Sequence, residues 1–362
     1  MKPTNKTLLI IIIIFSALLY LSFTFHNTLS PDEGYYAWQA RQIYENPFGF
    51  LDAFGDYDVI VPGVIAVFDV FLPSEFAARL VGVLFGLLGV YLMYLLGKEL
   101  KNKNLGLISA LFLAINPWYW MLACRILLDV PLTVMGMLNV FLLVKFYKTK
   151  EIKFLIYSII AFLGVLFTKS VGILFLTINI FMIIATYYPF KKINKRNLFV
   201  SIIVSMIAIT IPFLLYFQNI IYFFKRYINF ERIQGNYLVI NNIYNILFGY
   251  IPDQLFLLFY LLTIIFIAFL IYLLIKKNKQ RWIYLMLLMW IASVFGFRLF
   301  FGGHQIVRYV ISGLPAIILL VVIVLYEAYE LIKKKYKFKK LKKHIIILEN
   351  YLILEIENYG IK

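Results

Sequence analysis

The chain has 362 residues, of which 63% are hydrophobic and 15% are charged, and its formal net charge is +17. Soluble domains carry about 45–50% apolar residues, so this composition excludes an ordinary soluble protein and indicates an integral membrane protein. Lys and Arg are concentrated in short segments between apolar runs, which is typical of topology signals and argues against a nucleic-acid partner. The single cysteine, Cys124, excludes an internal disulfide bond and a cysteine-based metal cluster.

Apolar runs recur along the chain at lengths that suit membrane spans, since a helix needs about 20 apolar residues to cross the hydrocarbon core. They lie near residues 7–25, 76–97, 105–122, 130–147, 153–168, 171–189, 198–217, 254–275, 282–300 and 309–327. No small-residue cleavage site follows the first run, so we interpret it as a retained span rather than a cleaved signal peptide. The sequence therefore predicts an all-α, polytopic membrane helix bundle with about ten transmembrane helices.

The distribution of basic residues predicts the orientation of the bundle. If Lys2 and Lys6 are cytoplasmic, every second loop is basic, as the positive-inside rule requires. The later basic clusters fall within 98–103, 145–153, 191–196, 276–281 and 333–343. Both termini are therefore predicted to lie in the cytoplasm, and the protein to lie in the cell membrane as a multi-pass chain.

The apolar stretch from Val59 to Leu72 is a different case, because it is short and contains Pro62, Gly63 and Asp69. If this stretch were a span, every later basic cluster would lie outside the cell. We therefore predict that it forms a helix in the outer interface of the membrane.

The predicted domain organisation is a single bundle over residues 1–327. Its first outer loop, 26–74, is expected to contain interfacial helices, and a second large outer loop is expected at 218–253. The tail at 328–362 is strongly basic and is expected to lie in the cytoplasm against anionic lipid headgroups.

Two adjacent carboxylates, Asp32 and Glu33, follow the first predicted span. Such a pair beside a membrane costs free energy unless water hydrates it, a cation binds it or a reaction uses it. The motif Ser30-Pro31-Asp32-Glu33 also matches a helix capping box, in which Ser30 is the cap and Glu33 reaches back to it. That alternative accounts for Glu33 better than for Asp32, so Asp32 is the stronger candidate for a chemical role.

Further polar residues are predicted at the outer ends of the spans. They are Arg125, Asp129, Lys169, Arg298, His304 and Arg308. On a helix, Arg125 and Asp129 share a face, as do His304 and Arg308, because each pair is four residues apart. Arg and Lys can hold a phosphate in the headgroup plane, and a carboxylate can take a proton from an attacking hydroxyl.

Each of these residues also has a structural interpretation that the sequence leaves open. Arg125 and Asp129 can form a plain ion pair, and Lys169 and Arg298 can extend along the lipid to the interface. His304 can be an ordinary loop residue. Glu75 and Arg79, at the start of the second span, are interpreted as a structural pair.

The order of these motifs resembles the C-type (GT-C) membrane glycosyltransferases. The resemblance rests on the carboxylate pair at 32–33, Ser74–Leu80 at the start of the second span, and Arg125–Leu132. The turn Thr168–Ser170 and the segment His304–Tyr309 fit the same pattern. The most similar branch comprises the dolichyl-phosphate-mannose protein mannosyltransferases and the aminoarabinose transferases.

This resemblance implies a transferase that moves a hexose, such as mannose, from a polyprenyl or dolichyl phosphate to an acceptor hydroxyl on the outer membrane face, with inversion. It implies that Asp32 is the general base, with Glu33 as its catalytic neighbour. The candidates for binding the donor phosphate are Arg125, Lys169, His304 and Arg308, with Asp129 and Tyr309 in supporting positions. No cofactor is expected, but a divalent cation held by Asp32, Glu33 and Asp129 is left open as an alternative.

The expected partners are a polyprenyl-phosphate-linked sugar, membrane lipids and an acceptor. Because we expect no large outer domain after the bundle, the loops at 30–74 and 218–253 would recognise the acceptor. That expectation favours a lipid-linked glycan or a glycolipid over a protein acceptor. Two alternatives are a flippase for a lipid-linked saccharide and a non-catalytic GT-C partner in glycan assembly. Transporters usually place polar groups near the bilayer midplane, whereas these charges are predicted at one surface.

Overall fold

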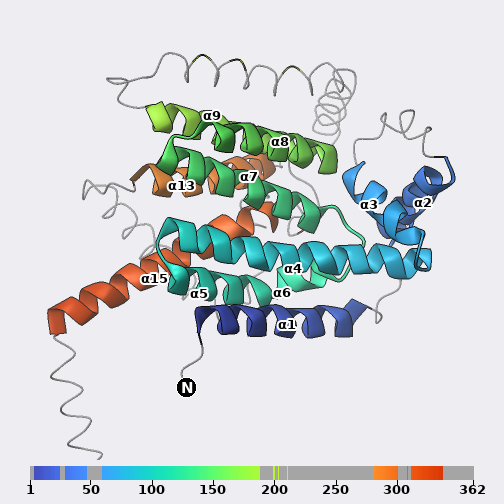
Figure 1. The fold of residues 1–362 in the computed structure, drawn as a ribbon, viewed down its shortest axis with the longest axis horizontal. Helices are drawn as coiled ribbons and strands as arrows, with labels where there is room; N and C mark the ends of the chain where they lie inside the picture. The colour runs from blue at the N-terminus through green and yellow to red at the C-terminus, as the bar shows by residue number, and fades with distance from the viewer. Residues whose placement is uncertain are drawn as a thin grey trace, which may run out of the picture.

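The computed structural model describes residues 4–24, 29–46, 59–187, 281–300, 308 and 311–336, together with residues 199, 203 and 210. Every regular element in these residues is a helix, and most of the helices lie side by side in a bundle (Figure 1). Five of the described helices are long and apolar enough to cross a membrane, or six if one bent pair counts as a single span. The predicted all-α, polytopic fold is confirmed.

The bundle and its flanking elements follow the predicted order along the chain. The long helices are α1 (Asn5–Thr24), α4 (Ser74–Leu100), α7 (Asp129–Thr149), α8 (Ile152–Thr168), α9 (Phe175–Tyr187), α13 (Arg281–Phe300) and α15 (Leu314–Tyr336). The predicted spans near 198–217 and 254–275 lie outside the described residues, apart from three single positions, as do the loop at 218–253 and the chain beyond residue 336.

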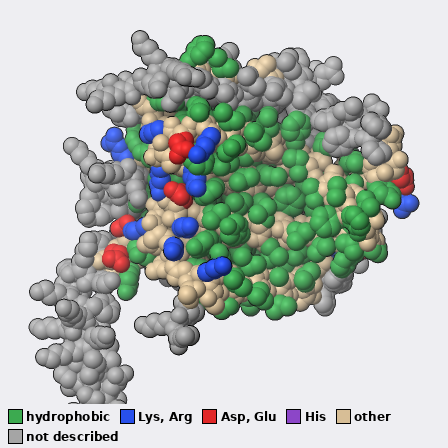
Figure 2. Space-filling model, viewed as in Figure 1, with side chains coloured by type: hydrophobic (Ala, Val, Ile, Leu, Met, Phe, Trp, Pro, Cys, Tyr) green, Lys and Arg blue, Asp and Glu red, His purple; other side chains and the backbone are tan. Residues whose placement is uncertain are grey.

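The two ends of the bundle differ in charge. Lys and Arg side chains gather at the left end of the molecule in Figure 2, and a broad apolar face follows. That end holds the turns between α4 and α5 and between α7 and α8 (Figure 1). The short helices α2 (Pro31–Glu45) and α3 (Ile60–Asp69) pack together at the opposite end. Helices α2 and α3 and the acidic residues at the start of α2 are therefore separated from the basic turns by the length of the spans.

Helix α3 corresponds to the stretch that was predicted not to span the membrane. It has only ten residues, which is about 15 Å of helix and too short to cross the hydrocarbon core. The Val59 backbone N–H donates to the Phe167 carbonyl at 3.1 Å. This contact ties the start of α3 to the end of α8, beside the position that Lys169 occupies.

The predicted span at 105–122 is not one straight helix. It is divided into α5 (Lys103–Ala114) and α6 (Pro117–Ala123), which are bent by 67°. The break has a local cause, because Pro117 cannot donate a backbone hydrogen bond and the Asn116 side chain caps α6 by accepting from the Tyr119 N–H at 3.2 Å. The bend is followed by the non-helical segment at 124–128.

The predicted structural pair of Glu75 and Arg79 is confirmed. Glu75 Oε1 lies 3.0 Å from Arg79 Nη2, and Arg79 Nη1 donates to the Thr24 carbonyl at 2.7 Å. Because Arg79 is buried, this contact fixes the end of α1 against α4 and so fixes the point from which the chain enters the first loop.

Helices α4 and α5 approach each other through glycines. A Cβ atom at Gly97 would lie 2.7 Å from the Gly106 Cα, whereas a Cβ atom at Gly164 in α8 would meet nothing closer than 3.6 Å. Small residues allow membrane helices to approach closely and gain van der Waals contact. The Gly97–Gly106 contact therefore sets the separation of α4 and α5.

Gly97→Ala is expected to lower the stability of the bundle by about 1–3 kcal/mol, because the added methyl group forces two backbones apart. Gly164→Ala is the matched control, since it removes a helical glycine without a close contact and is expected to be neutral or stabilising. Thermal unfolding of both variants in detergent tests this. Equal melting temperatures for the two variants would contradict the packing argument.

Candidate active site

The start of α2 is fixed by a capping box that uses Glu33. Ser30 is the cap, in an extended conformation, and Pro31 occupies the first turn. The Ser30 backbone N–H donates to Glu33 Oε2 at 2.8 Å. The capping-box interpretation of this motif is therefore confirmed.

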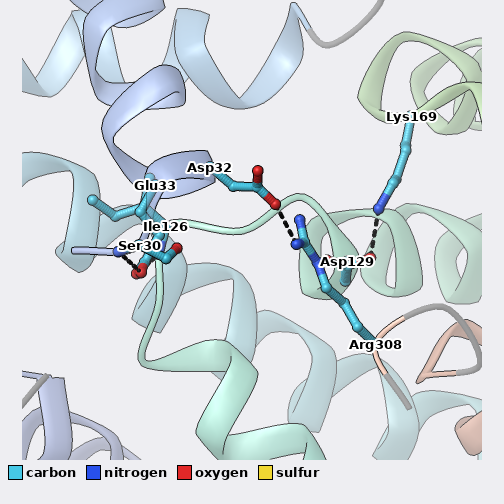
Figure 3. Close-up of polar contacts among 7 residues, drawn as sticks. All are labelled: Ser30, Asp32, Glu33, Ile126, Asp129, Lys169 and Arg308. Atoms are coloured by element: carbon cyan, nitrogen blue, oxygen red, sulfur yellow. Dashed lines mark hydrogen bonds and ion pairs between the residues drawn. The ribbon is translucent and has the colours of Figure 1, made fainter. Parts of the chain in front are cut away.

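The second oxygen of Glu33 reaches another part of the chain. Glu33 Oε1 accepts a hydrogen bond from the Ile126 backbone N–H at 3.1 Å (Figure 3). Ile126 lies in the segment between α6 and α7, and the Glu33 side chain is completely buried. Glu33 thus joins α2 to the turn that precedes Asp129, with both carboxylate oxygens bonded to backbone amides.

Asp129 lies at the centre of the polar contacts at this end of the bundle. It is the first residue of α7 and is 1% exposed. Its Oδ1 lies 2.6 Å from Lys169 Nζ and its Oδ2 lies 2.5 Å from Arg308 Nε (Figure 3). A carboxylate at a helix N-terminus is favoured by the helix dipole, and a buried carboxylate needs such cationic partners.

Arg308 connects this buried carboxylate to Asp32. Its Nη1 donates to Asp32 Oδ2, while its Nε remains on Asp129. Burial acts to lower the pKa of the Arg308 guanidinium, but the charges and hydrogen bonds of Asp129 and Asp32 outweigh burial and raise it. Arg308 is therefore a permanent cation, shared between a buried and an exposed carboxylate.

We call Asp32, Asp129, Lys169 and Arg308 the ion-pair network. Its two carboxylates and two cations sum to zero net charge. Among these four residues, only Asp32 is strongly exposed to solvent: 53% of its side chain is exposed, compared with 15% for Arg308. The network therefore presents one exposed carboxylate at its rim, paired with Arg308, and its two cations are less exposed.

The backbone directs Lys169 into the network. Helix α8 ends at Thr168, and Lys169 is extended, with φ −164° and ψ 136°, before a 3-10 turn begins at Ser170. The Lys169 side chain is 12% exposed and bonds to Asp129. The alternative in which Lys169 extends to the membrane interface is therefore wrong.

Arg125 is not part of the network. The expectation that Arg125 and Asp129 share a helix face is wrong, because residues 124–128 are not helical and α7 begins only at Asp129. The plain ion pair between these two residues is likewise absent, since Asp129 bonds to Lys169 and Arg308 instead. His304, Tyr309 and the Arg298 side chain lie outside the described residues.

Asp32, Glu33 and Asp129, the possible ligands of a divalent cation, do not point toward a common centre. Glu33 faces backbone amides and Asp129 faces two cations, as described above. Within the described ranges, no group of three His, Cys, Asp or Glu side chains is placed to hold a metal ion.

Asp129 has a larger role than its predicted supporting position. A carboxylate at the start of a predicted apolar helix is a signal that could have pointed to it, because burial there demands a partner. The contact between Glu33 and the Ile126 backbone amide could not be predicted from the sequence, because almost every residue carries a backbone N–H group.

Comparisons with known proteins agree with this fold. Residues 63–216 match the family model described as dolichyl-phosphate-mannose-protein mannosyltransferase. No curated protein matches the chain.

Solved structures resemble the chain over most of its length. ArnT from Cupriavidus metallidurans in the apo state is 18% identical, with a TM-score of 0.58, over 87% of this chain and 59% of that one. The apo oligosaccharyltransferase of Archaeoglobus fulgidus is 14% identical, with a TM-score of 0.56, over 93% and 52%. The archaeal oligosaccharyltransferase AglB from the same organism, in complex with an inhibitory peptide and a dolichol-phosphate, is 13% identical, with a TM-score of 0.57, over 97% and 54%.

The chain thus spans just over half the length of these proteins. At such identities the likeness concerns the fold, and it agrees with the family match over 63–216. The family match over part of the chain and the shared fold both agree with the resemblance to the GT-C type membrane glycosyltransferases.

Proposed function

We propose that this protein is a membrane glycosyltransferase that moves a sugar from a polyprenyl-phosphate donor to an acceptor hydroxyl on the outer face of the membrane. The observation that carries the proposal is the ion-pair network, in which the buried Asp129 holds two partly buried cations and the exposed Asp32 carboxylate bonds to one of them, Arg308. The family match and the dolichol-phosphate bound by AglB support a lipid-phosphate donor. The separation of the network from the basic turns supports the outer face.

Arg308 and Lys169 are the proposed donor-phosphate site. Each donates one hydrogen bond to Asp129, and both side-chain types carry several N–H donors that suit phosphate oxygens. Asp129 holds the two cations side by side, so they can meet two oxygens of one phosphate without reorganising. Arg125 provides additional positive charge nearby in sequence, and His304 and Tyr309 remain proposed contributors.

The bond between Arg308 and Asp32 suggests how donor binding prepares the base. The donor phosphate would replace the Asp32 carboxylate on Arg308 Nη1, while Nε stays on Asp129. Asp32 would then be free to accept a proton. Since Asp32 is already half-exposed, this exchange requires no unfolding of α2.

In the proposed reaction, the acceptor hydroxyl oxygen attacks the anomeric carbon from the face opposite the phosphate. A new carbon–oxygen bond forms, the bond from the anomeric carbon to the phosphate oxygen breaks, and the hydroxyl proton passes to Asp32. The electron pair leaves with the polyprenyl phosphate, so the configuration inverts. Arg308 and Lys169 stabilise the charge that grows on the leaving phosphate, and we expect no cofactor.

Asp32→Asn is expected to reduce turnover by roughly 10²–10⁴-fold, because a general base contributes about that factor. The assay is transfer of labelled sugar from polyprenyl-phosphate donors to lipid-linked acceptors in membranes that contain the protein. Glu45→Gln is the control, since it alters a similarly exposed carboxylate at the far end of α2. Unchanged turnover in Asp32→Asn would remove Asp32 from the role of base.

Glu33→Gln is expected to act on stability, in contrast to Asp32→Asn. The glutamine can offer only one oxygen, so either the Ser30 or the Ile126 amide loses its partner. An unsatisfied buried amide costs about 1–3 kcal/mol. Thermal unfolding in detergent should show a lower melting temperature for Glu33→Gln than for Asp32→Asn, and the reverse order would contradict the capping role.

A further inference from the structure

Helix α2 carries two exposed aromatic rings directly after Asp32. Tyr35 is a neighbour of Asp32 on the helix surface and Trp38 is a neighbour of Tyr35, because each pair is three residues apart. Tyr35 is 41% exposed and Trp38 is 55% exposed. The rings thus extend from the exposed carboxylate along the surface of the first loop, over about 9 Å of helix.

The two rings form one continuous surface. Their centroids are 5.9 Å apart and their planes are inclined by 30°. At that separation the rings are offset rather than directly superposed, and both side chains are exposed. A ligand with a flat apolar face can therefore contact both.

Tyr35 is held in place from two sides. The buried ring of Tyr36 lies edge-on to it, with centroids 5.8 Å apart, and the Gln39 amide nitrogen donates to its hydroxyl at 3.1 Å. The Gln39 carbonyl oxygen is buried and has no hydrogen-bond partner among the described residues. The Tyr35 ring is therefore held in place beside a buried amide oxygen that lacks a hydrogen-bond partner among the described residues.

Membrane anchoring is the competing explanation for exposed aromatic rings. An interfacial helix inserts a continuous apolar face in which aliphatic side chains accompany the aromatic rings, and the lipid-length helix α1 exposes Ile11, Ile14 and Leu18. The exposed residues of α2 are of another kind: Pro31, Asp32, Tyr35, Trp38, Arg41, Gln42, Tyr44 and Glu45. No exposed aliphatic side chain lies among them, which favours a polar ligand over lipid chains.

We propose that Tyr35 and Trp38 form a stacking platform for a pyranose ring of a carbohydrate acceptor. A pyranose presents C–H groups with partial positive charge on its faces, which complement the negative faces of aromatic rings. Its hydroxyls surround that face, and one of them would point along α2 toward Asp32. This inference rests on the proposed function and adds to it the chemical class of the acceptor, a saccharide rather than a peptide.

The first test is steady-state transfer with the full chain in nanodiscs. Tyr35→Ala and Trp38→Ala should each raise the KM for a lipid-linked glycan acceptor by about tenfold, with kcat and the donor KM unchanged. Trp38→Phe and Tyr35→Phe, which keep a ring, should restore most of the affinity. Tyr44→Ala is the matched control, because Tyr44 is 51% exposed on the same helix but lies three turns from Asp32.

An unchanged acceptor KM in the double variant Tyr35→Ala/Trp38→Ala would overturn the platform. So would an equal rise in the KM of the lipid-linked donor, because that result would assign the rings to the membrane interface. Thermal unfolding of each variant checks that the fold is retained.

A second measurement does not depend on catalysis. The nanodisc-embedded protein is applied to an array of neutral and charged oligosaccharides, and the double variant is compared with the Tyr44→Ala control. Binding that is lost only in the double variant supports the platform, even if no transfer is detected and the proposed function fails. Binding that persists in the double variant, or a wild type that binds no saccharide, overturns the platform while leaving the transfer assay to test the function.

Discussion

The buried carboxylate of Asp129 is the constraint on which the site depends. It lies at the N-terminus of α7, almost without exposure, and its two oxygens bind Lys169 and Arg308. A buried charge is tolerated only with such partners, so Asp129 connects three segments that are far apart in the sequence. The bend between α5 and α6 and the segment at 124–128 place Asp129 where this is feasible.

The two adjacent acidic residues at the start of α2, Asp32 and Glu33, make different contacts. Glu33 is buried on backbone amides and fixes α2 against the turn before α7. Asp32, one residue away, projects to the other side and meets Arg308 at the exposed rim. A structural attachment and an exposed carboxylate therefore lie next to each other, and in our proposal the aromatic rings farther along α2 hold the acceptor near that carboxylate.

Much of this arrangement was predictable from the sequence. Apolar run lengths predicted the membrane bundle, and the Ser-Pro-Asp-Glu motif offered capping by Glu33 as an alternative to the catalytic role that the resemblance implied for it. The pairing of Asp129 was not predictable, because a spacing of four residues suggested a helix that the Asn116-Pro117 break and its following turn prevent. The true partners are 40 and 179 residues away along the chain, a separation at which local patterns carry no information.

The central claim concerns Arg308. Its Nε stays bonded to Asp129, and Asp32 and the donor phosphate compete for its Nη1. The most direct test is the affinity of the nanodisc-embedded protein for polyprenyl phosphate in a double-mutant cycle of Asp32→Asn and Arg308→Gln. Asp32→Asn should bind the lipid roughly tenfold more tightly than wild type, because it removes the competing charged hydrogen bond. In the Arg308→Gln background, that gain should largely vanish. Weaker binding by Asp32→Asn, or the same gain in both backgrounds, would contradict the account.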